Sequence, residues 1–324
     1  MHSYSRRDFG KLVIAGVPLT LALGTQQLRA ATDLRLGIST DSFRELPRLP
    51  GLDNVDDVLR AVKLSGIKEI ELADGNVLPA GPNSGPAAPP PPAAYPKNAH
   101  IFTPEEIAYA RAALRVTYRE WRIETPDSTF RAIRQKIGAA GLTLHAYRVE
   151  FDDTFTDAEI EHTFAQATAM GAGIVSASVA LPLAKRLAPF AERVHVLLSL
   201  ENQADASKPG AVASLAQFDD ALALSKSIRL KMDAGAVTAA NGDSVAALKN
   251  FGSQITHVQI TDRTRNGGKS HKLGDGDTPI AAVLAAVASR GDRMPIFIDY
   301  DYVGLGTAAE EVTRCLEYVR RVAG

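Results

Sequence analysis

The sequence holds a single cysteine, Cys315, among its 324 residues. One thiol cannot form an internal disulfide, so no disulfide within the chain stabilises this fold. The chain also lacks a charge excess, because 36 basic and 37 acidic side chains leave a formal net charge of −1. Four of the basic residues and only one of the acidic residues lie in the first 30 positions, so the remainder is slightly acidic. This balance argues against binding to nucleic acid or to an anionic membrane.

Long hydrophobic runs are also missing. The apolar run at residues 12–23 is short for a bilayer span, and Pro18 interrupts it. It follows the paired arginines of SRRDFGK and precedes small residues at Ala30 and Ala31. This arrangement resembles a twin-arginine export signal, although Gly10 stands where that pattern has leucine. The resemblance implies that residues 1–31 direct export to the periplasm by the twin-arginine machinery, with no membrane attachment after cleavage. The alternative is an uncleaved anchor helix.

The rest of the chain alternates between two kinds of segment. Short apolar runs rich in valine, isoleucine and leucine recur between amphipathic stretches, which is typical of a parallel sheet built from βα units. Eight such units predict a (β/α)8 TIM barrel over residues 32–324. An open doubly wound sheet is the alternative, but no glycine-rich phosphate-binding turn follows the first run. The predicted strands are 34–39, 67–72, 142–147, 173–178, 194–200, 228–232, 256–260 and 295–300.

A long insertion separates the second and third predicted strands, at residues 76–127. It contains the proline-rich stretch GPNSGPAAPPPPAAYP and then TPEEIAYARAALRVTYREW, which has a capping threonine and a proline in its first helical turn. We expect the insertion to cover the top of the barrel, with a disordered tether as the alternative. Trp121, within it, is a candidate either for lining a sugar site or for the core.

Four predicted strands end in an oxygen donor. These donors are Glu201 in SLENQ, Asp233 in KMDAG, Gln259 in HVQITD and Asp299 in FIDYD. In a barrel the chemistry gathers where strands run out at the carboxyl-terminal face, so the four would share one rim. Acids that follow apolar runs are costly to bury unless a cation compensates them, which favours a metal site. The alternative is that each acid caps the next helix or pairs with a nearby basic side chain.

The ordered set LENQ, MDAG, ITHVQITD, LGDGD and FIDYD resembles the xylose-isomerase-like superfamily of sugar isomerases, epimerases and related lyases. The resemblance implies that Glu201, Asp233, Gln259 and Asp299 are metal ligands. Gln259 stands where most members have histidine, and Asp299 where most have glutamate. An all-oxygen set favours Mn²⁺ or Mg²⁺ over Zn²⁺.

The resemblance also implies catalytic roles for Glu201 and Asp299, on opposite faces of the substrate. His145, in the predicted strand 142–147, is a third catalytic candidate if it lies at the rim, and a structural histidine otherwise. The candidates for substrate binding are Arg148, His271 and Lys272. The last two lie in a glycine-rich loop, whose alternative role is only that of a solvated connection.

A divalent cation next to paired carboxylates suits proton abstraction beside a carbonyl. The predicted reaction is therefore isomerisation, epimerisation or β-elimination of an unphosphorylated keto-sugar or 3-keto-glycoside, because sugar phosphates stay in the cytoplasm. Ala236 stands where epimerases of the superfamily often have a substrate-contacting histidine. The alternative is a catalytically inactive periplasmic sugar-binding barrel. Either protein could form a homo-oligomer, but no segment identifies the interface.

Overall fold

The structure is a computed structural model that describes residues 34–80, except 47 and 50, and residues 103–324. The predicted export signal and the proline-rich stretch of the insertion lie outside the described residues.

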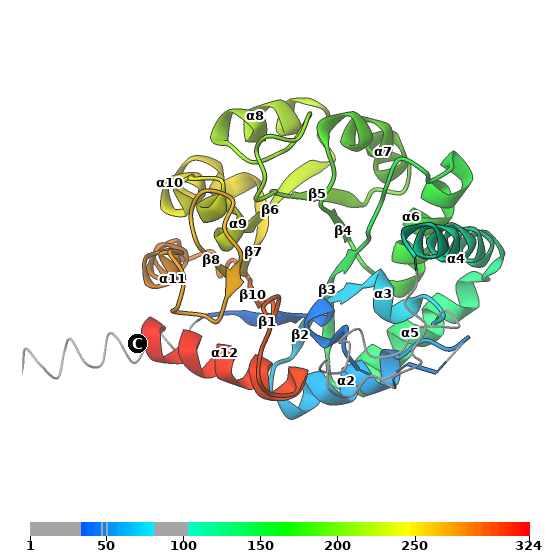
Figure 1. Cartoon of the computed structure of the whole chain (residues 1–324), viewed down its shortest axis with the longest axis horizontal. Coiled ribbons are helices and arrows are strands. Elements are labelled where there is room, and N and C mark those ends of the chain that lie inside the picture. The colour runs from blue at the N-terminus through cyan, green and yellow to red at the C-terminus, as the bar shows by residue number, and fades with distance from the viewer. Residues whose placement is uncertain (1–33, 47, 50, 81–102) are drawn as a thin grey trace, which may run out of the picture.

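Eight parallel strands close into a barrel in the order β1-β10-β7-β6-β5-β4-β3-β2 (Figure 1). Each strand overlaps one predicted segment, so the TIM barrel is confirmed and the open sheet is excluded. Most branched and long aliphatic side chains on these strands are buried, as a sheet covered by helices requires. The strands are β1 Leu36–Ser39, β2 Glu69–Ala73, β3 Thr143–Arg148, β4 Ile174–Ala177, β5 Leu197–Glu201, β6 Ile228–Asp233, β7 Ile255–Ile260 and β10 Ile296–Ile298.

Helices surround the strands and bury one face each against them (Figure 1). Local signals set their ends: Thr156 begins α6 with a capping box, and Gly171 ends it in the left-handed conformation at φ 80°. No helix of the described residues is long and apolar enough to cross a membrane. The outer helices are α2 Val55–Leu64, α5 Asp127–Ala139, α6 Asp157–Met170, α7 Leu181–Arg193, α8 Leu215–Ala223, α10 Ser244–Phe251, α11 Ile280–Ser289 and α12 Ala308–Ala323.

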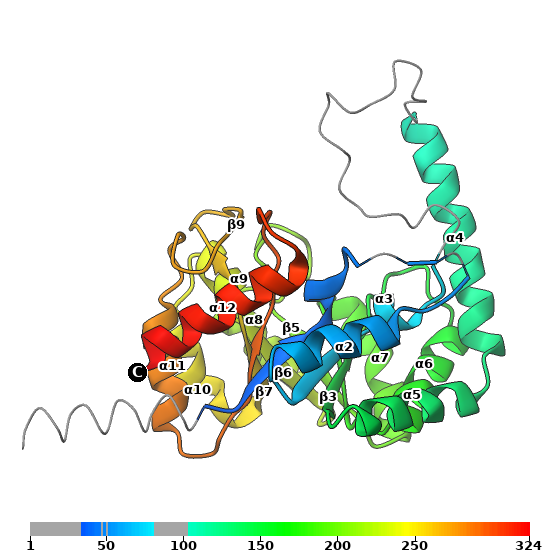
Figure 2. The ribbon, with the colours of Figure 1, turned by 90° about the horizontal axis from the view of Figure 1, so that it is seen from below.

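Further elements lie in the connections between the strands and the outer helices. Figure 2 shows the insertion helix α4 and strand β9 rising on the same side of the barrel. The predicted cap of this helix is confirmed, because Thr103 forms a capping box and Pro104 occupies the first turn. The additional elements are η1 Thr40–Phe43, α3 Asp74–Val77, α4 Pro104–Glu124, α9 Ala234–Ala239, η3 Gly252–Gln254, β8 Asp262–Arg263 and β9 Ser270–His271.

Buried ion pairs attach α4 to the barrel. Arg122 donates to Asp74 at 2.9 Å, and the two side chains are only 4% and 5% exposed. Nearer the start of the helix, Arg115 forms a two-pronged pair with buried Glu159 of α6, at 2.7 and 2.9 Å. Such pairs fix geometry because each buried charge needs its partner. The helical part of the insertion is therefore an integral part of the fold.

Removing one member of the buried Arg122–Asp74 pair should lower the stability of the fold far more than removing one member of an exposed pair. We expect Arg122→Met to lower the free energy of unfolding by about 3–5 kcal/mol, since it leaves Asp74 buried without compensation. Arg60→Met, which breaks an exposed pair with Asp57, should cost less than about 1 kcal/mol. Urea unfolding of both variants measures the difference. Equal losses would show that the α4 contact does not hold the helix in place.

Candidate functional site

The four predicted donors lie together at the carboxyl-terminal mouth of the barrel. Glu201 ends β5, Asp233 ends β6, Gln259 is the last but one residue of β7, and Asp299 directly follows β10. The strand register sets Asp233 beside Gln259, which in turn lies beside Phe297, two residues before Asp299. All four side chains are buried. The closure of the barrel thus brings together groups from four separate βα units.

Gln259 links two of the acids. Its Nε2 donates to Asp233 Oδ2 at 3.2 Å and to Asp299 Oδ2 at 3.0 Å. Its Oε1 is buried and has no hydrogen-bond partner among the described residues. An amide nitrogen and oxygen are assigned from their surroundings, and a half-turn of the group exchanges them. The amide therefore lies between two carboxylates with one polar atom unused.

Asp233 has two separate functions for its two oxygens. Oδ1 accepts from the backbone N–H of Ala236 at 2.9 Å and from the Thr261 hydroxyl at 2.6 Å, so it caps α9. Oδ2 faces Gln259. Asn202 holds the backbone on both sides, accepting from Asp233 N–H at 2.7 Å and donating to its carbonyl at 3.1 Å. Asp233 therefore caps a helix and also lies at the rim of the barrel.

Glu201 and Asp299 have opposite surroundings. Lys231 Nζ lies 3.0 Å from Glu201 Oε2, and Arg148 Nε donates to the same oxygen at 3.3 Å. No positively charged side chain among the described residues forms a salt bridge with Asp299. Its Oδ1 accepts from Ser42 Oγ at 3.2 Å. One carboxyl is thus compensated by two positive charges, and the other by neutral groups alone.

These surroundings separate the pKa values of the acids. Burial would raise the pKa of Glu201, but Lys231 and Arg148 outweigh it and lower that pKa. Burial, together with the charges of Asp41 and Asp301, raises the pKa of Asp299 well above its ordinary value. Burial and the charge of Glu201 raise the pKa of Asp233 to about 6. Asp233 can therefore hold and release a proton near neutral pH.

The four oxygen donors are of the chemical kind that a hard divalent cation prefers. They do not form a closed set of acids, however: no group of three or more His, Cys, Asp or Glu side chains among the described residues is arranged to hold a metal ion. The amide of Gln259 lies between Asp233 and Asp299. The buried, unpartnered Oε1 of Gln259 is a free ligand oxygen beside two acids whose pKa values are raised. A cation would lower those pKa values and use that oxygen.

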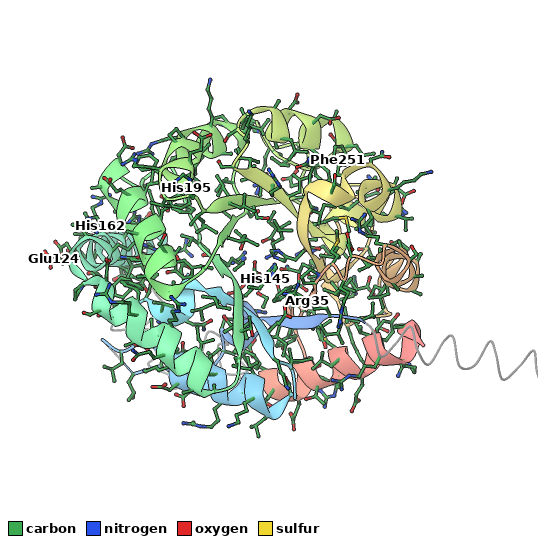
Figure 3. All side chains as sticks on the ribbon, turned by 180° about the vertical axis from the view of Figure 1, so that it is seen from behind. Arg35, Glu124, His145, His162, His195 and Phe251 are labelled. Carbon is green, nitrogen blue, oxygen red and sulfur yellow. The ribbon has the colours of Figure 1, made fainter. Side chains whose placement is uncertain are left out.

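His145 lies below the rim, which favours the structural alternative for it over the catalytic one. The register between β2 and β3 shifts at this residue, and its ring packs against His257 at 4.9 Å and Phe297 at 5.1 Å between ring centroids. Those residues are two positions before Gln259 and Asp299, one layer deeper in the barrel. Figure 3 shows His145 near the barrel centre, together with Arg35. Burial and the neighbouring His257 lower the pKa of His145 to about 3.

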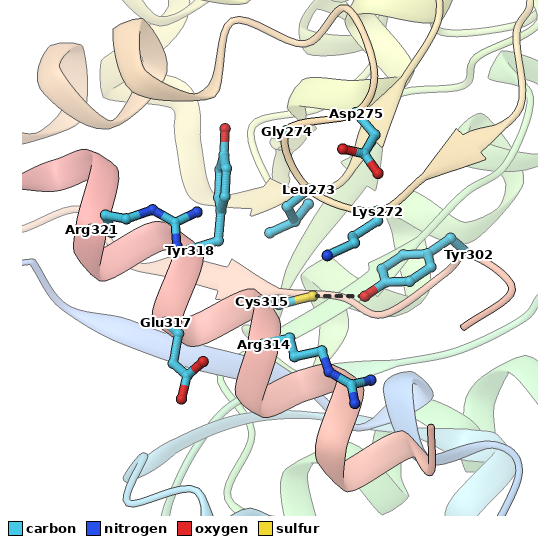
Figure 4. A pocket seen from close by; sticks show the side chains of 10 residues that line it. All are labelled: Lys272, Leu273, Gly274, Asp275, Tyr302, Arg314, Cys315, Glu317, Tyr318 and Arg321. Atoms are coloured by element: carbon cyan, nitrogen blue, oxygen red, sulfur yellow. Dashed lines mark hydrogen bonds between the residues drawn. The ribbon is translucent and has the colours of Figure 1, made fainter. Parts of the chain in front are cut away.

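The other predicted binding residues divide into two groups. Arg148 lies at the rim and contacts Glu201. His271 lies in β9, where it pairs with Asp262. Lys272 lines a cavity of about 340 Å³ between residues 272–275 and α12, with Tyr318 and Arg321 (Figure 4). None of the four rim donors lines that cavity.

The LGDGD turn is organised by Asp262. Its carboxylate accepts from the backbone N–H groups of Gly274 at 2.7 Å, Gly276 at 3.0 Å and Thr278 at 3.1 Å. A Cβ on Gly276 would lie 2.3 Å from the Asp262 carboxylate, so only glycine allows this close approach. The motif therefore shapes the loop rather than contributing a donor to the rim.

Several polar contacts of the rim were missed by sequence reasoning. They come from Ser42, Thr261 and Asn202, which hold Asp299 or Asp233, and from Lys231. Period-two alternation within strands was an available signal for Lys231, because it lies two residues before Asp233 on an otherwise apolar strand. Trp121 packs edge-on against Phe130, with ring centroids 5.6 Å apart, which confirms the core alternative for it.

No protein-family model matches the sequence, and no curated protein matches it. Solved structures do match. A xylose isomerase domain protein from Planctomyces limnophilus aligns with a TM-score of 0.56 at 13% identity, covering 89% of this chain and 95% of that one. The IolI protein with a bound zinc atom aligns with a TM-score of 0.59 at 14% identity, covering 90% and 98%.

A third match is the D-psicose 3-epimerase of Clostridium cellulolyticum H10 with D-tagatose. It aligns with a TM-score of 0.57 at 11% identity, covering 90% of this chain and 99% of that one. At this level of identity the likeness establishes the fold alone. The chain shares the (β/α)8 barrel fold with these structures.

The raised pKa of Asp233 gives a testable pH dependence. Protonation of Asp233 stabilises the cation-free protein below about pH 4, and this contribution is lost as the pH rises through about 6. Asp233→Asn keeps the cap but has no charge. In EDTA it should therefore be more stable than the unmodified protein by about 1–3 kcal/mol at pH 7.5, and by much less at pH 4.5.

Urea unfolding at the two pH values checks this. Asp243→Asn is the matched control, because Asp243 caps α10 through the same kind of hydrogen bonds at the surface. The same pH dependence in both variants would show that Asp233 is an ordinary cap.

Proposed function

We propose that this chain is an enzyme that removes a proton beside the carbonyl of an unphosphorylated keto-sugar or keto-glycoside, with a divalent cation bound. Isomerisation, epimerisation and β-elimination all begin with this step. The observation that supports it is the contrast in charge around two carboxyls. Glu201 contacts the positively charged side chains of Lys231 and Arg148, whereas Asp299 lies beside an amide and other acids. Two carboxyls whose pKa values are pushed apart are the equipment of an acid and a base at one site.

Asp233, Gln259, Asp299 and Glu201 are the residues that would hold the cation. Their all-oxygen donor set favours Mn²⁺ or Mg²⁺. When bound, the cation would polarise the carbonyl and stabilise the negative charge that develops as the proton leaves.

The side chains divide the remaining work. Glu201, held ionised by its two cationic neighbours, takes the proton from carbon. Asp299, the second carboxyl of the pair, returns a proton to the carbon skeleton or to the departing oxygen. Arg148, which contacts Glu201 through Nε, binds a substrate oxygen next to the base.

The structural neighbours support the class of reaction and substrate. One is a D-psicose 3-epimerase with D-tagatose, and another holds a zinc atom. Both share the barrel at 14% identity or less, so they bear on the kind of chemistry and leave the individual substrate open.

Proton exchange is the direct test. The protein with Mn²⁺ is incubated in D₂O with a panel of unphosphorylated keto-sugars and 3-keto-glycosides, and NMR follows both deuterium incorporation and product. We expect Glu201→Gln to lower the rate by about 10²–10⁴-fold, as removal of a general base does. Glu150→Gln, which removes an exposed carboxylate that also contacts Arg148, should change it little.

A sugar that binds in the presence of metal without any exchange or product would contradict the proposal. It would favour the sugar-binding barrel without catalysis.

We further propose that the protein reaches the periplasm by twin-arginine export, on the strength of the SRRDFGK stretch and the short apolar run after it. Replacing both arginines conservatively, as Arg6→Lys/Arg7→Lys, should retain the full-length chain in the cytoplasm. Cell fractionation and immunoblotting measure the distribution. Unchanged export of this variant would rule out the twin-arginine route.

A further inference from the structure

A fully buried lysine lies directly under the rim. The strand register places Lys231 of β6 beside Glu201 of β5. Its Nζ is 2.7 Å from Glu71 Oε2 and 3.0 Å from Glu201 Oε2, and its side chain has no exposed surface. A buried ammonium is costly unless it is fully paired, and here it joins one carboxylate in the core to one in the site.

The core end of this link is held firmly. Glu71 Oε1 accepts from Ser176 Oγ at 2.6 Å and lies 3.1 Å from His257 Nε2. His257 Nδ1 is in turn 2.9 Å from Thr256 Oγ1. Ser176 lies in β4 and His257 in β7, so two strands other than its own hold Glu71 in place. Lys231 is therefore anchored from below through its ion pair with Glu71.

The site end is asymmetric. The two positively charged side chains, Lys231 and Arg148, both contact Oε2 of Glu201, and neither hydrogen-bonds its Oε1. Arg148 also lies near Asp41 and Glu150, at 3.8 and 3.3 Å, so its interaction with Glu201 is shared. Lys231 has no other acid at the rim within salt-bridge distance in the described part of the chain. The orientation of Glu201 depends mainly on the lysine.

We propose that Lys231 is a positioning residue: anchored by Glu71, it holds Glu201 by Oε2 so that Oε1 is presented to the mouth of the barrel. This rests on the proposed function, because Oε1 is the oxygen that would receive the proton or ligate the cation. Stability alone gives no reason for the arrangement, since apolar residues of similar volume often replace a buried ion pair without loss.

The test must avoid leaving an unpaired buried charge. Lys231→Met alone would do so and would destabilise the fold. The paired variant Glu71→Gln/Lys231→Met removes both charges of the lower ion pair, and the amide introduced by Glu71→Gln can still bond Ser176 and His257. The matched control is Arg122→Met/Asp74→Asn, which neutralises a buried ion pair at the α4 contact.

Two readouts separate positioning from a structural role. Crystal structures of the metal-free proteins show the side chain of Glu201, and calorimetric titration with Mn²⁺ gives the affinity. In the paired variant we expect Glu201 to rotate toward Arg148 and the Mn²⁺ affinity to fall about 10–100-fold, the usual effect of losing a partner behind a ligand. The control should keep both the Glu201 conformation and the affinity.

If Glu201 keeps its original conformation in the paired variant and the Mn²⁺ affinity changes less than about twofold, the inference is overturned. Lys231 would then be only a countercharge for the core. If the unmodified protein takes up no Mn²⁺, the proposed function fails. The crystal structure of the paired variant still decides the positioning inference in that case, because the conformation of Glu201 is measured without metal.

Discussion

Charge compensation inside a closed barrel is the constraint on which the rest of this structure depends. Strands that alternate inward and outward residues stack side chains in layers around the axis, so a charge on one strand must find its partner on another strand. Lys231 of β6 pairs in this way with Glu201 of the neighbouring β5 and with Glu71 of β2, which lies across the barrel. A core of this kind is held together by specific pairing as well as by apolar packing.

The compensation is complete in the lower layer and incomplete at the mouth. Glu201 contacts two positively charged side chains, Lys231 and Arg148, whereas Asp233 and Asp299 share the neutral amide of Gln259. Burial then favours the protonated forms of those two acids. A structural ion-pair network would have no reason to leave this imbalance at the end of the strands. The imbalance suits the proposed site, which would accept positive charge from a cation or a proton from a substrate.

The sequence predicts the strands and the rim residues for a physical reason. Apolar runs of strand length recur eight times, and the residue at the end of each run must lie at the carboxyl-terminal face of a barrel. The pairing one layer down is not predictable in this way, because it depends on the stagger between strands that closure imposes. Lys231 meets Glu201 through that stagger. The position of His145 is not predictable for the same reason, because a register shift between β2 and β3, which the alternation does not show, falls at this residue.

Gln259 shows why an amide suits this position. With no cation present, its Nε2 donates to two acids that would otherwise face each other across the rim. Its Oε1, left without a partner, is the ligand oxygen that a cation would use. A neutral histidine has one donor nitrogen and would satisfy only one of the acids, and a protonated histidine would oppose the cation. The amide is neutral at every relevant pH, so it can stabilise both the cation-free and the cation-bound site by turning through half a circle.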